Sequence, residues 1–304
     1  MIADMTGGHW VHNLDPVMVH LWGNFGIRYY GLAYVAGFIG GMLIHRQMVR
    51  RNRSPLSGDK EESAVFAVIL GVLLGARIGY VVFYALPVFF EDPLFIFRLW
   101  EGGMSSHGGF IGVTLAGWWI ARKNGMRLTE FGDIVAPLVP LGLFLGRLAN
   151  FINGELWGIP SNVPWAIIFP NSAPGVPVDM IPPRHPSQLY EAMLEGLVLF
   201  VYLQWRFWKT EAQQRPGRIC GEFLILYGLF RIFCEQFREP DAALILGMSR
   251  GVFYSLILPV IGAFFWWRSR KLTLQWQAVR PLQDSVQQVP KTQRLPSGHK
   301  RRKK

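Results

Sequence analysis

The chain has 304 residues, of which 51% are hydrophobic and only 17% are charged. Soluble domains usually carry about a quarter of their residues as charged ones, and the 22 Phe and 12 Trp are an excess typical of membrane interfaces. The net charge of +11 does not indicate nucleic-acid binding, because the basic residues lie between apolar runs and in a C-terminal tail rather than on one face of a soluble domain.

Seven apolar runs approach or reach the length of a membrane-spanning helix, about 17–25 residues. In chain order they cover residues 27–44, 63–86, 107–121, 131–151, 187–205, 219–237 and 251–267. The third run is short and must borrow residues from a flank. We therefore predict an all-α integral membrane protein with seven transmembrane helices in one catalytic domain, residues 1–267.

Two connecting segments are too long to be simple turns. Residues 156–186 are rich in Pro, Asn and Ser, with a short apolar run at 165–169, so we expect a small extracytoplasmic cap with strand or hairpin pieces. Residues 91–109 combine aromatics with Pro93 and two Gly-Gly steps, which suits an interfacial or re-entrant piece and an ordinary loop equally well. Residues 268–304 form a basic cytoplasmic tail that we expect to be disordered; it either touches anionic lipid or only fixes the topology.

The positions of Lys and Arg predict the orientation in the membrane. Of the 31 basic residues, 23 lie in the loops after the first, third and fifth runs and in the tail, whereas four lie in the loops on the other side. We therefore expect the N-terminus outside and the C-terminus in the cytoplasm. Because no basic residue precedes Arg28, the charged start of a cleavable signal peptide is missing, and the first span should remain as an anchor.

The most polar stretch inside an apolar setting is residues 146–158, Gly-Arg-Leu-Ala-Asn-Phe-Ile-Asn-Gly-Glu-Leu-Trp-Gly, at the end of the fourth run. On a helix Arg147, Asn150 and Gly154 share one face, because they fall at i, i+3 and i+7. An arginine near the centre of a bilayer costs about 2.5–3.5 kcal/mol on insertion scales. Arg147 therefore needs a compensating partner, and an anionic lipid head group would supply one.

Arg147 and Arg238 come from different runs, yet both are predicted near the outer half of the membrane. Their planar guanidinium groups suit a phosphate, which each grips with two hydrogen bonds. The alternative is that each pairs with a carboxylate inside the bundle. Arg231 fits this alternative better, because Glu235 lies four residues further along the same helix.

Other charged residues in the apolar runs also need partners. Glu191 and Glu195 are four residues apart on the fifth helix and must face inward, where we expect them to pair with buried arginines. Arg77 lies between two glycines that would allow another backbone to approach. It either braces Glu155 or the lipid, or is purely structural, and the sequence favours neither.

His107 lies in a glycine-rich setting at the mouth of the third run, where an imidazole with a pKa of about 6.5 can take a proton from a thiol. Asn150 and Asn153 either orient a glycerol hydroxyl or an ester carbonyl, or cap the end of the helix. Glu155 either braces an arginine or faces the head group. Tyr30 either places a hydroxyl inside the bundle or is an interfacial aromatic anchor.

Common catalytic fingerprints are missing from the sequence. It contains no zinc-ligand spacing, P-loop or dinucleotide fingerprint, and no Gly-x-Ser-x-Gly nucleophile motif. We therefore expect no metal and no cofactor. Since the chain offers no strong covalent nucleophile of its own, direct displacement between two bound substrates is favoured over a covalent enzyme intermediate.

Residues 146–158 resemble the signature of the bacterial prolipoprotein diacylglyceryl transferases. The resemblance extends to five other segments in order along the chain, residues 29–32, 75–80, 106–109, 184–191 and 237–241. It implies transfer of the sn-1,2-diacylglyceryl group from phosphatidylglycerol to the lipobox cysteine of a prolipoprotein signal peptide, in the bacterial cytoplasmic membrane. It also implies catalytic roles for His107, Arg147, Arg238 and Tyr30, and substrate contacts by Arg77, Arg147, Asn150, Asn153, Glu155, Gly158 and Arg238. One departure is Ile159, where many relatives carry a basic residue.

Two other functions are compatible with the same features. Broken spans with buried charge also mark solute transporters, although the two halves of the chain show no convincing repeat. A non-enzymatic protein that binds lipid or signal peptide would need the same pocket. We expect the protein to contact membrane lipids, to bind no nucleic acid and to work as a monomer.

Overall fold

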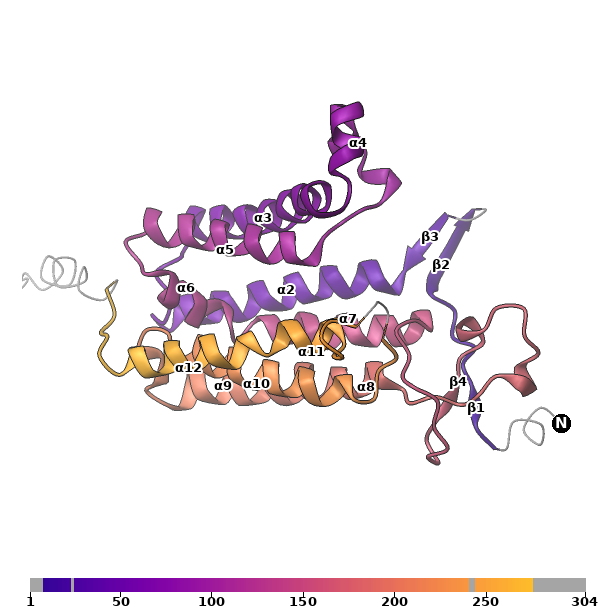
Figure 1. Cartoon of the computed structure of the whole chain (residues 1–304). Coiled ribbons are helices and arrows are strands. Elements are labelled where there is room, and N and C mark those ends of the chain that lie inside the picture. The colour runs from indigo at the N-terminus through magenta and orange to yellow at the C-terminus, as the bar shows by residue number, and fades with distance from the viewer. Residues whose placement is uncertain (1–7, 23–24, 241–243, 276–304) are drawn as a thin grey trace, which may run out of the picture.

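The computed structural model describes residues 8–22, 25–240 and 244–275, with only the backbone described at Phe25, Leu99, Ser106 and His107. Over these residues the protein is mainly helical, as predicted, and its long helices run side by side with strands gathered at one end (Figure 1). The α-helices are α2 (Tyr29–Arg50), α3 (Asp59–Tyr84), α4 (Leu86–Glu91), α5 (Ser106–Lys123), α6 (Leu128–Val135), α7 (Val139–Asn153), α8 (Ser187–Glu191), α9 (Leu199–Lys209), α10 (Arg218–Glu235), α11 (Arg250–Ser255) and α12 (Ile257–Ser269).

All seven apolar runs of the sequence are mainly helical, although the first two residues of the first run, Ile27 and Arg28, belong to a strand. Helices α2, α3, α5 and α10 each account for one run, and α5 gains residues at both ends of the short third run. By length and apolarity, two helical stretches of the described chain are able to cross a membrane, Asp59–Tyr84 and Arg250–Ser269. The pair α6–α7 makes a third if its two bent halves are counted as one span.

Two of the helical runs are interrupted where they contribute to the candidate site. Helices α6 and α7 meet at an angle of 49°, and Pro140 near the start of α7 lacks the N–H that would continue a regular helix. Between α8 and α9 the chain forms the π-helical turn η5 (Ala192–Val198), a feature often found at functional sites. There Gly196 packs so closely on α7 that an added Cβ would lie 2.6 Å from Cα of Phe144.

The N-terminal residues form strands that the sequence analysis did not anticipate. Strands β2 (Val17–Trp22) and β3 (Phe25–Arg28) pair as an antiparallel hairpin that leads into α2. Strand β1 (Trp10–Val11) pairs in parallel with β4 (Ile167–Ile168). The predicted strand within residues 156–186 is thus present, and besides β1 it pairs antiparallel with Arg184 of the same segment, since Ile167 and Arg184 exchange backbone hydrogen bonds of 2.9 and 2.8 Å.

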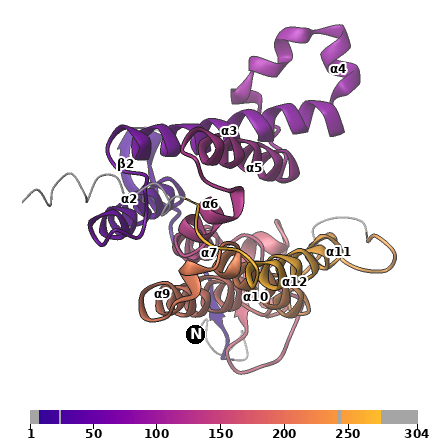
Figure 2. The same ribbon diagram turned by 90° about the vertical axis from the view of Figure 1, so that its left-hand side faces the viewer.

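Helices α3 and α5 form a closely packed pair above α2 and the rest of the bundle (Figure 2). Glycines make this approach possible: an added Cβ at Gly112 would lie 1.9 Å from the carbonyl oxygen of Gly71. The expectation that the glycines flanking Arg77 admit another backbone is confirmed, since Cβ atoms at Gly75 and Gly79 would meet the backbone of α5. Beyond α3, residues 86–101 form α4 and the 3₁₀ turns η1 (Pro93–Phe97) and η2 (Leu99–Glu101), and α4 projects away from the bundle (Figure 1).

The buried hydrophobic core lies where α5 and α9 end and α10 begins. Its fully buried members include Ile120, Leu203, Phe207 and Ile219. Elsewhere large apolar side chains of the long helices face outward; Phe66 of α3 is 64% exposed and Val260 of α12 is 68% exposed. Exposed apolar surface on this scale is expected where helices contact lipid.

The first residues of the predicted C-terminal tail belong to the part of the chain that the structure describes. Arg268 and Ser269 still belong to α12, and the chain that follows contacts the loop before α6, where Arg127 Nη1 donates to the carbonyl oxygen of Thr273 at 3.0 Å. The predicted domain boundary at residue 268 thus falls inside α12, and the domain division stays a prediction. The predicted disorder of the remaining tail concerns residues 276–304, which lie outside the described chain.

Candidate active site

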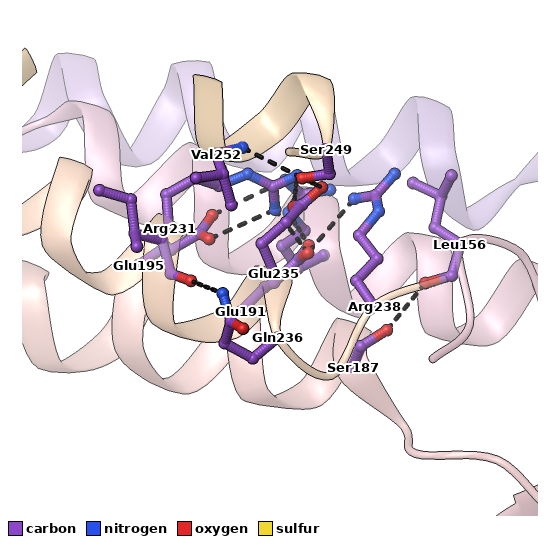
Figure 3. Close-up of polar contacts among 12 residues, drawn as sticks. Leu156, Ser187, Glu191, Glu195, Arg231, Glu235, Gln236, Arg238, Ser249 and Val252 are labelled. Atoms are coloured by element: carbon purple, nitrogen blue, oxygen red, sulfur yellow. Dashed lines mark hydrogen bonds and ion pairs between the residues drawn. The ribbon is translucent and has the colours of Figure 1, made fainter. Parts of the chain in front are cut away.

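A buried cluster of arginines and glutamates joins four elements of the bundle. Its members are Arg147 of α7, Glu191 of α8, Glu195 of η5, Arg231 and Glu235 of α10, and Arg238 just after α10. Figure 3 shows the carboxylates of Glu191, Glu195 and Glu235 turned toward the guanidinium of Arg231. Three positive and three negative side chains make the cluster formally neutral, which is how buried charges persist away from water.

Glu191 is the centre of the cluster. Its Oε1 accepts from Nη1 of Arg231 at 2.5 Å and from Nη1 of Arg238 at 3.2 Å, and its Oε2 lies 2.8 Å from Nε of Arg147. Glu195 lies further from the same partners, 3.4 Å from Arg231 and 3.7 Å from Arg147. The prediction that these two glutamates face inward and pair with buried arginines is confirmed.

Arg231 is bound only within the cluster over the described residues, as its sequence neighbours indicated. Besides Glu191 and Glu195, it contacts Glu235 four residues along α10, with Nη2 2.7 Å from Oε2. Glu235 in turn accepts from the hydroxyl of Ser249 at 2.9 Å, which ties α10 to the start of α11. The role of Arg231 is thus to hold carboxylates and helices together.

Arg147 differs from Arg231 because its side chain also lines a cavity. Its side chain remains 18% exposed while it pairs with Glu191 and Glu195. It lines a cavity of about 630 Å³ bounded by α2, α3, α5, α6 and α7. The sequence left open whether Arg147 pairs with a carboxylate or binds a phosphate. The structure shows the carboxylate contacts and a cavity beside them, and phosphate binding stays a prediction.

The cavity is polar at its two ends and apolar between them. Tyr30, Arg147 and Asn150 line one end, and His45 and Glu61 line the other. Tyr30 and His45 are fifteen residues apart on α2, which corresponds to about 22 Å of helix. The cavity volume lies within the range of about 300–1,000 Å³ usual for small-molecule sites, and its length suits an extended apolar chain with a polar head.

Asn150, Asn153 and Glu155 form one hydrogen-bonded group at the end of α7. Both amide nitrogens donate to Oε1 of Glu155, from Asn150 at 2.8 Å and from Asn153 at 3.1 Å. Gly154 ends α7 with a left-handed backbone, φ +61°, which brings Glu155 back toward Asn150. Asn150 faces the main cavity, whereas Asn153 faces a separate hollow of about 210 Å³ that is also lined by His12.

Tyr30 and His107 are placed differently by the structure. Tyr30 lines the cavity, with its hydroxyl 3.3 Å from that of Tyr34. His107 is the second residue of α5, two positions after the Ser105 cap, whose side chain accepts from the N–H of Gly108 at 3.3 Å. The side chain of His107 is outside the described structure, so its expected role stays a prediction.

Of the alternatives that the sequence left open for Arg77, the contacts of its guanidinium show a structural role, with backbone carbonyl oxygens rather than Glu155 as partners. Its buried guanidinium donates to five backbone carbonyl oxygens, those of Phe95, Ile96, Arg98, Gly102 and Gly103, at 2.5–3.0 Å. Five N–H donors are all that a guanidinium has. Arg77 therefore anchors residues 93–103 on α3, and a substrate contact would have to displace one of these bonds.

Gly158 has a packing role in the structure, and its substrate contact stays a prediction. An added Cβ there would lie 2.3 Å from the carbonyl oxygen of Phe237 and 2.6 Å from that of His185. Its N–H donates to His185, and its backbone pairs with that of Arg238. Only glycine fits between the backbone segments at Phe237 and His185. The backbone pairing of Gly158 with Arg238 positions Arg238 beside Glu191.

One positioning network was missed by the sequence analysis. Glu239 accepts from Nη1 of Arg184 at 2.7 Å and from the indole N–H of Trp157 at 2.8 Å, and Arg184 also donates to the carbonyl oxygen of Gly158. These residues all lie within the segments singled out above. Their spacing of 26 to 82 residues gives no local signal that they meet.

Comparison with known proteins identifies the family to which the chain with this charged cluster belongs. The sequence model of the family described as prolipoprotein diacylglyceryl transferase matches residues 16–268. The chain belongs to this family. Members of the prolipoprotein diacylglyceryl transferase family that resemble it include proteins named phosphatidylglycerol–prolipoprotein diacylglyceryl transferase from Rhodospirillum rubrum, Idiomarina loihiensis and Bradyrhizobium diazoefficiens. They are 49%, 45% and 45% identical to it, over 82%, 85% and 81% of this chain and 90%, 94% and 88% of their own length.

The family match covers every candidate residue of the site, from Tyr30 to Arg238. Arg147 and Asn150 line the cavity, and Arg238 reaches the same glutamate, Glu191, as Arg147. Arg77 has an anchoring role and Gly158 a packing role, and the substrate contacts expected of them stay predictions. Because the chain is a prolipoprotein diacylglyceryl transferase family member, the end of the cavity that Arg147 lines is the candidate active site.

Proposed function

We propose that this chain transfers the sn-1,2-diacylglyceryl group of phosphatidylglycerol to the lipobox cysteine of prolipoproteins, the first step of lipoprotein maturation. The single observation that carries the proposal is the position of Arg147: it pairs with two buried carboxylates and also lines a largely apolar cavity. Such a site suits a phosphate joined to long hydrocarbon chains. The family membership of the chain and the names of its relatives support the same reaction.

The proposed reaction is a direct displacement. The cysteine thiol gives its proton to a base, for which we propose His107, and the thiolate attacks the glyceryl carbon that carries the phosphate. A carbon–sulfur bond forms as the carbon–oxygen bond breaks, and the electron pair leaves with glycerol phosphate. The products are the thioether and glycerol phosphate, and no metal or cofactor takes part.

Arg147 and Arg238 stabilise the leaving phosphate in this account. A guanidinium carries five N–H donors, so the two carboxylate contacts of Arg147 leave donors for a second anion. Arg238 reaches the same carboxylate, Glu191, from the other side. Preorganised donors of this kind lower the barrier because they need no rearrangement as charge develops.

Tyr30 and Asn150 complete the head-group end of the cavity. We propose that they orient the glycerol or the ester carbonyl next to it, and that Glu155 acts as a positioning residue, since it fixes the amide of Asn150. Asn153 faces the neighbouring hollow, and its Oδ1 is buried without a hydrogen-bond partner among the described residues. That oxygen is free to accept from the incoming peptide.

We further propose seven crossings of the bacterial cytoplasmic membrane, with the N-terminus outside, residues 156–186 as an outer cap and the tail from the end of α12 in the cytoplasm. Seven helical runs, the exposed apolar side chains and the one-sided basic loops support this arrangement. Residues 1–267 then form one catalytic domain, which we propose works as a monomer on phosphatidylglycerol and a prolipoprotein signal peptide.

A purified-protein assay tests the proposed function. The full chain in vesicles that contain phosphatidylglycerol is mixed with a lipobox peptide, and the peptide mass is followed. We expect a diacylglyceryl mass gain on the cysteine, and none with a Cys→Ser peptide or with phosphatidylethanolamine vesicles. Binding of lipid and peptide without a mass gain would show a binding protein instead of a transferase.

A Gly146→Leu variant should block the cavity without unfolding the protein. Gly146 lines the cavity next to Arg147, and an added Cβ would meet nothing within 4 Å. Replacing a glycine inside a helix also removes a penalty of about 0.5–1 kcal/mol. We therefore expect transfer to fall by at least roughly tenfold, which is 1.4 kcal/mol, while the melting temperature stays the same or rises.

The matched control is Gly31→Leu. Gly31 also has nothing within 4 Å of an added Cβ, but it does not line the cavity. This variant should keep its activity. If Gly146→Leu were as active as Gly31→Leu, the cavity would not be where the lipid binds.

A further inference from the structure

A second hollow lies at the opposite end of the bundle from Arg147. Its volume is about 730 Å³, and its lining includes Trp118 and Arg122 of α5, Arg127 before α6, and Gln275 after α12. These elements meet at the end of the bundle away from the strands (Figure 1). No step of the proposed transfer uses this hollow.

Two guanidinium groups line the hollow without an acidic partner among the described residues. Arg122 lies over the ring of Trp118, 5.3 Å from its centre, and Nη1 of Arg127 donates to the carbonyl oxygen of Thr273 at 3.0 Å. Glu130 lies nearby but is buried and accepts from two backbone N–H groups, those of Arg127 at 2.8 Å and Gln275 at 2.5 Å. The positive charge that faces the hollow is therefore not neutralised by the described protein.

The surroundings of the hollow have the character of a membrane interface. Lys123 lies 4.9 Å from the ring centre of Trp119, Arg270 lies 4.1 Å from Trp266, and Lys271 lies 5.3 Å from Trp267. Tryptophan and basic side chains gather at the depth of the lipid head groups. A phosphate at this depth meets both arginines, and the apolar side of the hollow, with Trp118 48% exposed, meets the start of the acyl chains.

We propose that Arg122 and Arg127 bind the phosphate of an anionic phospholipid at this end of the bundle. Planar guanidinium forks match phosphate oxygens, and basic pockets between helices are suited to lipid head groups. The rest of the tail is an unsuitable occupant, because residues 276–304 carry eight Lys and Arg but a single acid, Asp284. Charge complementarity therefore favours an anionic ligand over this basic segment.

The test measures lipid retained by the purified full chain in native mass spectrometry, with phosphatidylserine as an anionic probe that is not the proposed substrate. Arg122→Gln with Arg127→Gln should lower the affinity by about tenfold or more, as expected when two basic residues at a lipid surface are lost. The matched control, Arg50→Gln with Arg51→Gln, changes the same charge on exposed residues away from the hollow. It should retain the lipid like the wild type.

Three results separate the alternatives. Equal retention by the Arg122/Arg127 pair and the wild type would overturn the site. Release of the lipid by millimolar inorganic phosphate would overturn the lipid assignment in favour of a soluble anion. Transfer activity and the melting temperature of the pair should match the wild type, so that loss of lipid here is distinguishable from failure of the proposed transferase reaction.

Discussion

An Arg147→Ala variant is expected to lose roughly 10²–10³-fold in kcat/KM, the range seen when one preorganised donor to a developing anion is removed. Arg147 alone among the clustered arginines is shown lining the cavity of the described chain. Its loss therefore removes the charge nearest to the proposed phosphate. The measurement is the rate of diacylglyceryl transfer to a lipobox peptide at several lipid concentrations.

Arg147→Lys provides the graded control for this prediction. A lysine keeps the positive charge near Glu191 and Glu195 but loses the planar fork that grips two oxygens. Its activity should lie between those of the wild type and Arg147→Ala, with a melting temperature close to that of the wild type. Near-normal transfer by Arg147→Ala would leave Arg147 with a structural role only.

A Glu191→Gln variant is expected to lose about 3–5 kcal/mol of stability, the range for removing one partner of a buried ion pair. Glu191 contacts three arginines and is 1% exposed, so its loss leaves buried positive charge without compensation. The measurement is thermal unfolding in detergent. Glu195→Gln should shift the melting temperature less, because the contacts of Glu195 with Arg147 and Arg231 are longer.

The double variant Arg147→Ala with Glu191→Gln separates pairing from substrate binding. It removes one charge of each sign, so the cluster stays balanced, and the coupling between the two sites should restore part of the lost stability. Activity should not return, because the proposed phosphate ligand is still missing. Recovery of both stability and transfer would mean that Arg147 serves only to neutralise Glu191.

The sequence predicted the helices well because each run has a strong local signal. Apolar length identified all seven helical runs, and the spacing of Glu191, Glu195, Arg231 and Glu235 indicated an inward charged face. The spacing of residues did not predict the hydrogen-bond partners of Arg77. Its partners are carbonyl oxygens of an irregular segment, and backbone acceptors carry no residue-type signal.

The contacts that the sequence did not predict are those between distant segments. Strand β1 pairs with β4 across more than 150 residues, and Glu239 meets Arg184 and Trp157 from separate loops. The family resemblance implied a substrate contact at Gly158, which stays a prediction. In the structure it is a glycine because the carbonyl oxygens of Phe237 and His185 leave no room for a Cβ.

The most direct measurement is a structure of the wild-type protein in a bilayer of phosphatidylglycerol. The account predicts a lipid phosphate at hydrogen-bonding distance from Arg147, about 3 Å, with an acyl chain running along the cavity between α2 and α7. A cavity without lipid, with Arg147 bound only to Glu191 and Glu195 and the phosphate elsewhere on the protein, would contradict it.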